Sequence, residues 1–548
     1  MGNARLGAGA SDVQDRVSAG AWTKGLTAAP PRVRVQVHGV GRNMIREQEI
    51  ELKLEVDEAG ARMLRRHPML MAEQGTPTEQ LSVYFDTPDA TLRDAGFSLR
   101  VRKSGDRYTQ TIKQGGNGTS GLFHRPEWEC NVDGADPDLV AAAATPLGDV
   151  ITKKVAKRLR SMFRSEVRRT IWNLKRDGGE VELALDEGQI IAGKQREAFA
   201  ELELELKSGA PETLLELARE LAGEVPMRLG VLTKAERGYA LAEGRNGAAA
   251  KAEPIILRSS MTVAQGFARV VHGCLRHYRI NERLLLERRD PLALHQARVA
   301  MRRLRSAFTL FRPAIADDED EQLREELRWF TSQLGDARNL DVLMKRLSNA
   351  PGNKSGKSLG TKLEAARQRA YDHALEAIGS ARLRRLMLEL VMWLEAGEWR
   401  ERKAATKPLP GFLARQLDRR WRKVRKAGAK MASLDAEHRH RLRIDVKKLR
   451  YSLEFSSFIL GRQDERKAFL AQLEEMQEHL GELNDVETAG QLLGRILGDD
   501  VDGKSLRHYA LGHIRKSSSE VEQLAAGERA FERLAAIGRF WRPDPLPS

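Results

Sequence analysis

Charged and apolar side chains alternate along several short stretches in the first half of the chain. In residues 49–54 the charged side chains of Glu49, Glu51 and Lys53 fall on one face of a strand and the apolar ones on the other, because successive strand residues point to opposite sides. The same alternation returns in the segments 100–102, 127–129 and 201–207. Charges repeated on several strands predict a barrel with a charged interior and an apolar outer face. The alternative is an open antiparallel sheet whose charged face lies in water.

The spacing of these patterns predicts the elements between residues 45 and 243. Strands are expected at 48–56, 80–86, 97–103, 106–114, 123–132, 163–176, 179–186, 188–194 and 198–207. Helices are expected at 58–66, 137–145, 148–161 and 211–223. Many antiparallel strands at short spacing favour a barrel or a sandwich.

Composition divides the chain into zones. Residues 1–44 are expected to be a flexible extension, and residues 45–243 are expected to form the strand-rich domain. A Gly- and Ala-rich stretch within 244–257 predicts a linker, after which residues 258–540 show helical patterns almost throughout. Within this helical zone, residues 349–360 are expected to form a loop. The fold class predicted is therefore α+β and multidomain, with a β barrel first and an all-α bundle second.

The helical zone contains an internal repeat. The run His-x₂-Arg-x₃-(Arg/Lys)-(Arg/Lys)-Leu-Arg begins at His295 and again at His440. Each run is followed by a segment in which Leu-Gly leads into acidic residues, at 334–341 and at 480–487. Two copies of one helical unit predict a bundle with internal duplication.

The balance of charge points to a polyanionic partner. The 548 residues include 92 Lys and Arg against 77 Asp and Glu, which gives a net charge of +15 and a pI near 9.8. The two cysteines, Cys130 and Cys274, are too few for a disulfide framework or a zinc site. The sequence has no apolar run of about 18 residues or more and no apolar signal-peptide core, so we expect a cytoplasmic protein without a membrane partner.

The charged strand faces, taken together, predict a site for metal ions and phosphate. Carboxylates are the hard oxygen ligands that Mg²⁺ and Mn²⁺ prefer, and the candidates are Glu49, Glu51, Glu127, Glu129, Glu201, Glu203 and Glu205. Cationic donors suit phosphate oxygens, and the candidates are Arg100, Arg102, Lys113 and Arg125. In one barrel interior the two sets would compensate each other around a metal and a triphosphate. The reaction indicated is metal-assisted transfer of a phosphoryl group to water.

The run Glu49-Ile50-Glu51-Leu52-Lys53 matches the ExExK signature of the CYTH domain, the domain of the triphosphate tunnel metalloenzymes. Segments similar to later parts of that family follow in family order, at 84–88, 99–102, 111–113, 125–129, 184–188, 201–207 and 232–239. Residues 45–243 therefore resemble the CYTH family over their whole length.

This resemblance implies an eight-stranded antiparallel tunnel that hydrolyses a triphosphate with Mg²⁺ or Mn²⁺. It implies a catalytic set of Glu49, Glu51 and Lys53. It implies metal ligands at Glu49, Glu51, Glu127, Glu129, Asp186, Glu201, Glu203 and Glu205. It implies substrate binding by Arg100, Arg102, Lys113, Arg125, Arg169 and Lys234, with Lys234 near one mouth. Arg168 and Arg169 are adjacent on a strand, so only one can face inward, and Arg169 is preferred.

The basic helices of the two repeats predict a groove for an extended polyanion. At about 100° per residue, the basic side chains of each run fall within an arc of roughly 80°. The residues concerned are His295, Arg298, Arg302 and Arg305 in the first repeat and His440, Arg443, Lys447 and Arg450 in the second. The alternative is a solvated helix face, although the stripes hold few acidic residues for i,i+4 pairs. The nearby acids Asp336, Asp341, Glu482 and Asp485 are expected to orient the basic residues rather than to bind metal.

The two basic runs and the two Leu-Gly segments resemble the CHAD domain, a histidine-containing α-helical domain, over about 258–540. The first repeat departs from that family at Asn339, where an Asp is common. The resemblance implies binding of long-chain inorganic polyphosphate and recruitment to polyphosphate granules.

The leading functional prediction is a hydrolase of inorganic triphosphate with an appended polyphosphate-binding module, as in bacterial triphosphatases that combine CYTH and CHAD domains. The alternatives are hydrolysis of thiamine triphosphate or of a nucleoside or RNA triphosphate, adenylate cyclase activity, and a non-catalytic polyphosphate-binding adaptor. Aromatic residues are 5% of the chain, and the basic stripes contain only Tyr451, so free polyphosphate fits the helical zone better than nucleic acid does.

Overall fold

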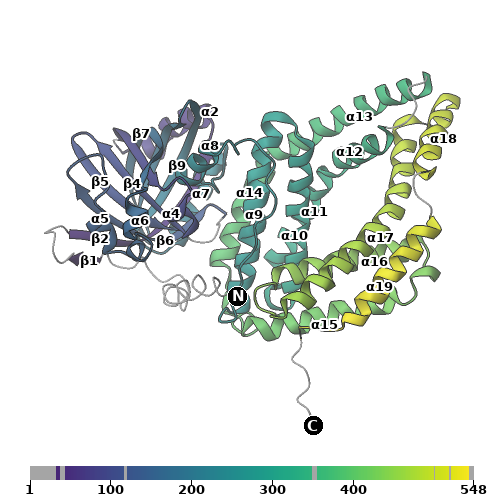
Figure 1. The fold of residues 1–548 in the computed structure, drawn as a ribbon. Coiled ribbons are helices and arrows are strands. Elements are labelled where there is room, and N and C mark those ends of the chain that lie inside the picture. The colour runs from purple at the N-terminus through teal and green to yellow at the C-terminus, as the bar shows by residue number, and fades with distance from the viewer. Residues whose placement is uncertain are drawn as a thin grey trace, which may run out of the picture. The chain divides into compact units, whose positions relative to one another are not determined.

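The computed structural model describes residues 33–36, 43–73, 75–115, 120–348, 354–498, 500–516 and 520–541 (Figure 1). The chain forms two compact units, the first holding Met1–Ala248 and Met387–Glu395 and the second Ala249–Leu386 and Ala396–Ser548. Within the predicted extension 1–44, Val33–Gln36 form strand β1, and Asn43 begins the next strand. The rest of that segment lies outside the described residues.

Eight antiparallel strands of the first unit close into a barrel. Their order around the barrel is β2-β6-β5-β4-β3-β7-β8-β9, and β9 pairs back with β2 through Glu51–Glu55 and Glu201–Glu205. The strands are β2 (Asn43–Val56), β3 (Thr76–Asp86), β4 (Phe97–Ser104), β5 (Arg107–Gln114), β6 (Leu122–Val132), β7 (Arg160–Arg176), β8 (Gly179–Ala192) and β9 (Gln195–Gly209). Two short strands, β1 and β10 (Met227–Leu229), also pair with β2. The predicted eight-stranded antiparallel barrel is confirmed.

The apolar faces of the barrel strands form the core outside the barrel. Leu52 and Leu204, which lie opposite each other on β2 and β9, are fully buried. Leu99 of β4 packs in one cluster with Ala141 and Leu147, which belong to the short helices that cover this side. Burying one leucine side chain contributes roughly 2 kcal/mol. This packing turns the charged side chains of the same strands toward the barrel interior.

The helices of the first unit are mostly short. They are α2 (Glu58–Arg65), α3 (Pro68–Met71), α4 (Thr91–Asp94), α5 (Leu139–Ala143), η1 (Pro146–Asp149), α6 (Lys153–Ala156), α7 (Glu212–Glu224) and α8 (Lys234–Ala242). The helix predicted at 148–161 is wrong, because η1 and α6 occupy only part of it and β7 begins at Arg160.

The two strands predicted at 179–186 and 188–194 are a single strand, β8. The predicted gap at residue 187 is absent, because Glu187 pairs with Arg168 and Gly188 with Val167 of β7. A Cβ atom at Gly188 would lie 2.1 Å from the carbonyl oxygen of Glu166. Glycine therefore permits a close approach of two strands here and does not end one.

Helix α8 and a group of aromatic side chains fill one end of the barrel. The inward-facing side chains of Tyr84, Phe163 and Phe199 share a buried cluster with Tyr239 of α8. The Phe163 ring lies 4.6 Å from that of Tyr84 and 5.1 Å from that of Tyr239. A Cβ atom at Gly238 would lie 2.0 Å from the Phe163 ring, so α8 sits against this ring as closely as glycine allows.

The second unit is helical, as predicted. Its elements are α9 (Val263–Arg288), α10 (Pro291–Ile315), α11 (Asp318–Gln333), α12 (Gly335–Leu347), α13 (Lys354–Gly379), η2 (Glu398–Glu401), α15 (Leu409–Gly428), η3 (Met431–Ser433), α16 (Ala436–Phe455), α17 (Gln463–Leu497), α18 (Val501–Lys516) and α19 (Glu520–Ile537). Helix α14 (Ala381–Ala396) is divided, because its residues Met387–Glu395 belong to the first unit. The two basic runs lie on α10 and α16, which contact each other, and the segments that follow them lie on or next to α12 and α17. The loop predicted at 349–360 is wrong from Lys354 onward, where α13 begins. A search of the described helices for one long and apolar enough to cross a bilayer finds none.

Candidate functional site

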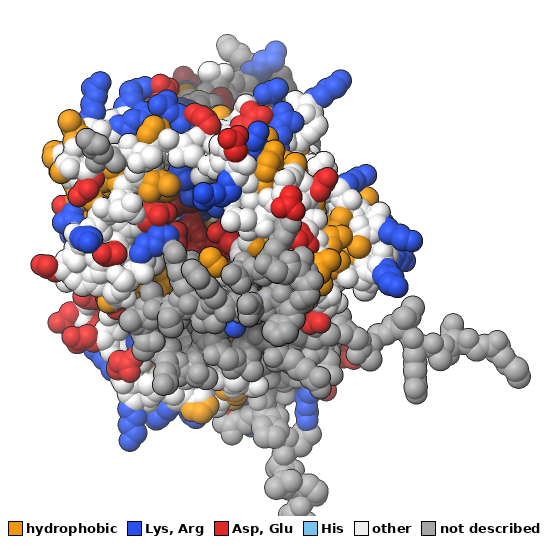
Figure 2. Space-filling model, turned by 90° about the vertical axis from the view of Figure 1, so that its left-hand side faces the viewer, with side chains coloured by type: hydrophobic (Ala, Val, Ile, Leu, Met, Phe, Trp, Pro, Cys, Tyr) orange, Lys and Arg blue, Asp and Glu red, His pale blue; other side chains and the backbone are white. Residues whose placement is uncertain are grey.

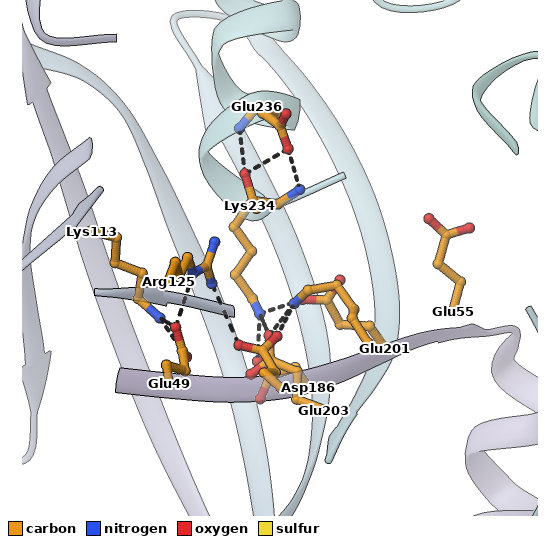
Figure 3. Close-up of polar contacts among 12 residues, drawn as sticks. Glu49, Glu55, Lys113, Arg125, Asp186, Glu201, Glu203, Lys234 and Glu236 are labelled. Carbon is orange, nitrogen blue, oxygen red and sulfur yellow. Dashed lines mark hydrogen bonds and ion pairs between the residues drawn. The ribbon is translucent and has the colours of Figure 1, made fainter. Parts of the chain in front are cut away.

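Six charged side chains from five elements meet inside the barrel next to α8, and Figure 3 labels four of them, Asp186, Glu201, Glu203 and Lys234. We call them the inner cluster: Lys53, Arg169, Asp186, Glu201, Glu203 and Lys234. The ammonium of Lys53 lies 3.0 Å from Glu201 Oε1 and also contacts Glu203. The ammonium of Lys234 lies 2.7 Å from Asp186 Oδ2 and 2.8 Å from Glu203 Oε1, and Arg169 donates two hydrogen bonds of 2.6 Å to Asp186.

Local structure explains how Lys234 enters this cluster. A capping box between Thr233 and Glu236 starts α8, so Lys234 is the first residue of the helix. Figure 3 shows its side chain reaching from that first turn toward Asp186, Glu201 and Glu203. Lys234 was expected near a mouth of the tunnel, but it lies at the end that α8 fills, and it is buried.

Opposite charges hold the inner cluster ionised in spite of burial. Burial by itself would raise the pKa of Glu203, but Lys234, Lys53 and Arg169 hold that pKa well below its ordinary value. Burial would lower the pKa of Lys53, but the carboxylates of Glu201 and Glu203 hold it well above its ordinary value. Each charge is thus compensated by a partner that would itself be costly to bury alone.

The carboxylates of the inner cluster suit a hard divalent cation. Asp186, Glu201 and Glu203 each offer one oxygen, and these three atoms lie within 4.8 Å of one another. The Oε2 atom of Glu201 is buried and, within the described part of the chain, has no hydrogen-bond partner. An all-carboxylate set with an unsatisfied buried oxygen is the donor chemistry that Mg²⁺ or Mn²⁺ takes.

A second group of charges lies farther from α8. We call it the middle cluster: Glu49, Glu51, Lys113, Arg125 and Glu127. The Glu49 carboxylate lies 2.8 Å from Lys113 Nζ and 2.9 Å from Arg125 Nε (Figure 3). Lys113 Nζ also lies 3.0 Å from Glu127 Oε2, and Glu51 lies between Arg125 and Lys53, at 3.5 and 3.2 Å. Glu51 therefore links the middle cluster to the inner cluster.

Two carboxyls of the middle cluster resist ionisation. Burial raises the pKa of Glu51 to about 7, and the nearby carboxylates of Glu203 and Glu49 act in the same direction. Burial likewise raises the pKa of Glu127 to about 8, again with help from Glu49. Acidic groups crowded in a buried site lack enough positive charge, which is what a bound metal ion supplies.

The end of the barrel opposite α8 is more exposed. Glu129 and Glu205, whose side chains are 34% and 26% exposed, lie there, whereas Glu201 is fully buried. Glu129 lies 3.4 Å from Arg102, and Glu205 lies 2.7 Å from Lys207. Figure 2 shows acidic side chains, with basic ones beside them, gathered in a hollow of the molecular face. We call this end the mouth.

The structure brings the predicted barrel residues into one interior. Arg169 contacts Asp186 across β7 and β8, as preferred over Arg168. Arg100 lies close to Glu127, Glu129 and Tyr84, which raise the pKa of its guanidinium against the effect of burial. Sequence reasoning did not single out Thr111, whose hydroxyl donates a 2.7 Å hydrogen bond to Glu129. Its position two residues before Lys113 on β5 was the available signal, because both then share the inner face.

In the helical unit, cations from three helices form a second candidate site. We call it the α10–α16 cluster: Arg298, Arg302, Arg338, Arg443 and Lys447. Burial lowers the pKa of Arg298 to about 10, with Arg302 and Arg338 acting in the same direction. Buried nitrogens of Arg298, Arg302 and Arg443 have no hydrogen-bond partner among the described residues. Positive charge is therefore in excess here, as an anion-binding site requires.

Individual members of the predicted stripes differ in their surroundings. Burial, followed by the charges of Arg338 and Arg302, lowers the pKa of His295 to about 4, whereas His440 is exposed. Arg450 lies 2.9 Å from Glu474 and 3.4 Å from Glu454, so acids neutralise it. Arg338 was not singled out, although it lies in the repeated segment 334–341.

The acids near these stripes form ion pairs with arginines. Asp485 lies 3.5 Å from Arg443 and 3.3 Å from Arg346. The other three, Asp336, Asp341 and Glu482, pair with Arg495, Arg367 and Arg346 at 3.2, 2.8 and 2.9 Å. Asp485 thus pairs with a residue of the predicted stripes, whereas the ion pairs of the other three acids are with arginines outside them.

Comparison with known families places both units. The CYTH domain model matches residues 47–239, and the CHAD domain model matches residues 269–494. The chain carries a CYTH domain followed by a CHAD domain. A curated relative of the CYTH domain is the inorganic triphosphatase of Haemophilus influenzae, 30% identical over 199 residues. That match covers 35% of this chain and 55% of the relative, so the chain spans about half the length of the curated relative it matches.

Two solved structures are similar to parts of this chain. The CHAD domain of the plant Ricinus communis is 28% identical, with a TM-score of 0.47, over 52% of this chain and 96% of that one. A putative adenylyl cyclase from Hippeastrum, described as having a dominant triphosphatase activity, is 18% identical, with a TM-score of 0.28. That match covers 36% of this chain and 96% of the other.

Proposed function

We propose that the CYTH domain hydrolyses inorganic triphosphate to diphosphate and phosphate, in a reaction that needs Mg²⁺ or Mn²⁺. The observation that carries the proposal is the inner cluster, where three carboxylates that suit a metal share a buried site with three cations that suit phosphate. The triphosphatase of Haemophilus influenzae, similar over the same domain, supports this choice of substrate.

The residues divide the work by position. Arg100, Arg102, Lys113 and Arg125 would bind the phosphate oxygens from the mouth inward, and Lys53, Arg169 and Lys234 would bind the innermost phosphate. Asp186, Glu201 and Glu203, with Glu49, Glu51, Glu127, Glu129 and Glu205 nearer the mouth, would hold the metal. The bound metal would neutralise charge on the phosphate oxygens and lower the pKa of a water molecule. Fixed charges in a buried site need little reorganisation during the reaction.

The direct test measures phosphate release from tripolyphosphate, thiamine triphosphate, ATP and long-chain polyphosphate, each with Mg²⁺ and with Mn²⁺. We expect the highest kcat/KM for tripolyphosphate and no release after chelation of the metal. A higher kcat/KM for thiamine triphosphate or ATP would replace the proposed substrate, and formation of cyclic AMP from ATP would indicate a cyclase. If the folded protein hydrolyses none of these four substrates, the remaining hypothesis is a non-catalytic adaptor that binds polyphosphate.

For the CHAD domain, we propose binding of long-chain inorganic polyphosphate at the α10–α16 cluster and, through it, association with polyphosphate granules. The proposal is supported by the largely buried cations of this cluster, which outnumber the carboxylates beside them and lie on the helices that carry the repeated basic runs. A flexible polymer with one negative charge on every unit matches such a row of cations.

This binding should depend on pH through Lys447. Burial, followed by the charges of Arg443 and Arg302, lowers the pKa of Lys447 to about 7. A bound polyanion would raise that pKa again, so binding takes up a proton, and affinity should fall about tenfold as the pH rises from 6 to 8.5. Without ligand the sign is opposite: stability should rise with pH above 7, where the folded protein has lost this proton and the unfolded chain still holds it.

The matched control for this effect is Lys447→Arg, since an arginine stays charged over the whole range. Polyphosphate titrations at several pH values should show a flat profile between pH 6 and 8.5 for this variant. An equal fall of affinity in the variant and the parent protein would rule out Lys447 as the titrating group.

A further inference from the structure

A second group of cations lies next to the α10–α16 cluster. Of its members, only Arg305 belongs to a predicted stripe. We call it the α15 cluster: Arg305 of α10, Arg420 and Lys423 of α15, and Lys448 of α16. Burial lowers the pKa of Lys448, and the charges of Arg420, Lys423 and Arg305 lower it further. These three cations, on α10 and α15, therefore act on Lys448, and both helices pack against α16.

Acids compensate this cluster only in part. Asp445 is the carboxylate with the largest effect on the pKa of Lys448 and of Arg420, and it raises both. Burial lowers the pKa of Arg420 to about 10, and its Nε atom is buried with no hydrogen-bond partner among the described residues. One carboxylate against four cations leaves an excess of positive charge.

The two repeats differ at the position of Arg305. Its counterpart Arg450 is neutralised by Glu454 and Glu474. Arg305 is exposed, makes no ion pair with any described residue, and lies near two more cations, Arg324 and Arg328 of α11. Those two have acidic neighbours of their own, Asp320 at 3.9 Å and Glu325 at 3.4 Å. The two repeats thus differ: the positive charge of Arg450 on α16 is neutralised, whereas no described residue neutralises that of Arg305 on α10.

The two clusters are continuous along α10. Arg305 follows Arg302 by three residues, so it lies on the same helix face about 4.5 Å farther along the axis. On α16 the neighbours Lys447 and Lys448 belong to one cluster each, Lys447 near Arg302 and Lys448 near Arg305. A polyanion bound at Arg298 and Arg302 can therefore reach the α15 cluster without crossing an uncharged gap.

We propose that the α15 cluster is a second contact surface for inorganic polyphosphate, used only by chains long enough to extend beyond the α10–α16 cluster. The proposal rests on the proposed polyphosphate binding and adds to it a dependence on chain length. A phosphate chain is favoured over single-stranded nucleic acid, which binds through stacking on exposed aromatic rings. The aromatic residue next to Arg420, Trp421, is buried and packs against Phe469.

The test uses the full chain with EDTA present, so that the metal-dependent tunnel does not consume the probe. The variant is Arg420→Gln with Lys448→Gln, and the control is Arg419→Gln with Arg422→Gln, which removes two exposed charges from the same helix. Binding of labelled long-chain polyphosphate is measured over a salt series. Short chains are measured by how well they displace the labelled polymer, because tripolyphosphate also enters the tunnel.

We expect the variant to bind long chains about tenfold more weakly, with the slope of log K against log salt reduced by about 2, and short chains as before. The control should match the parent protein. Lys423→Glu, at an exposed position, repeats the test with no buried side chain changed and should also weaken long chains selectively.

Three results would overturn the proposal. Unchanged long-chain binding in both the double variant and Lys423→Glu would do so, provided that Arg298→Gln with Arg302→Gln still weakens binding. Equal weakening of short and long chains would remove the dependence on length. Single-stranded RNA that competes as strongly as polyphosphate, and with the same sensitivity to Lys423→Glu, would change the ligand. If the Arg298 and Arg302 variant also binds normally, the proposed polyphosphate site itself fails.

Discussion

Replacing Glu201 by glutamine should abolish metal-dependent hydrolysis of tripolyphosphate, with kcat falling on the order of 10²- to 10³-fold. Glutamine keeps the volume of the side chain but removes the negative charge of the Glu201 carboxylate. The Oε2 atom of that carboxylate has no hydrogen-bond partner among the described residues. The substitution also removes one of the carboxylates that compensate Lys53 and Lys234. Phosphate release and direct Mn²⁺ titration of the same preparation should both show the loss.

The matched control is Glu180→Gln, on the same strand as Asp186 but exposed and 3.4 Å from Lys175. Its hydrolysis and Mn²⁺ affinity should stay at the parent values. Both variants should keep their affinity for long-chain polyphosphate, because the site proposed for it lies in the CHAD domain. Normal Mn²⁺ binding and hydrolysis by Glu201→Gln would show that the metal is held elsewhere in the barrel.

Changing Arg298, Arg302, Arg443 and Lys447 together to glutamine should weaken long-chain polyphosphate binding on the order of 10²- to 10⁴-fold. By analogy with the release of counterions from nucleic acids, the salt dependence should flatten by about 3 to 4 in slope. Binding titrations at several salt concentrations measure both quantities. The same variant should unfold at an equal or higher temperature without ligand, since these half-buried like charges repel each other.

A control with the same change of net charge is available on the exposed face of α15: Arg419, Arg422, Arg425 and Lys426 changed to glutamine. It should bind polyphosphate much as the parent protein does. If the control loses as much affinity as the cluster variant, net charge rather than the α10–α16 cluster would account for binding. Hydrolysis of tripolyphosphate should be unchanged in both variants.

Much of the barrel could be predicted because its strands alternate with a strict period of two. That period assigned Glu49 and Glu51 to one face, and ion pairs with Lys113, Arg125 and Lys53 now occupy that face. It also decided between Arg168 and Arg169, because adjacent residues of a strand cannot both point inward.

The errors came from glycine and from short elements. A break between strands was predicted at residue 187, just before Gly188, yet the missing side chain of Gly188 lets β8 approach β7 closely, which is a long-range contact that local pattern does not reveal. Residues 354–360 were read as a loop because of their Gly, Ser and Lys content, although they open α13, in which Leu359 and Leu363 are buried. Tertiary packing outweighs weak local preference at both places.

The distribution of charge between the two repeats could be predicted only in part, from Glu454 four residues after Arg450 where Thr309 follows Arg305. The runs that begin at His295 and His440 look equivalent, but the acids beside Arg450 come from later in α16 and from α17. The pair with Glu454 is an i,i+4 contact within α16, whereas only the packing of α17 brings Glu474 to Arg450.

The aromatic end of the barrel has a consequence for how a substrate enters and how products leave. Helix α8, Phe163 and Phe199 occupy that end, so the described part of the barrel is open only at the mouth, beside Arg102 and Glu129. A phosphate chain would then enter through the mouth with one terminus first. The products would leave through the same opening that the next substrate uses. If the proposed hydrolysis takes place in this barrel, departing diphosphate meets the same cations on the way out, so we expect diphosphate to inhibit the reaction.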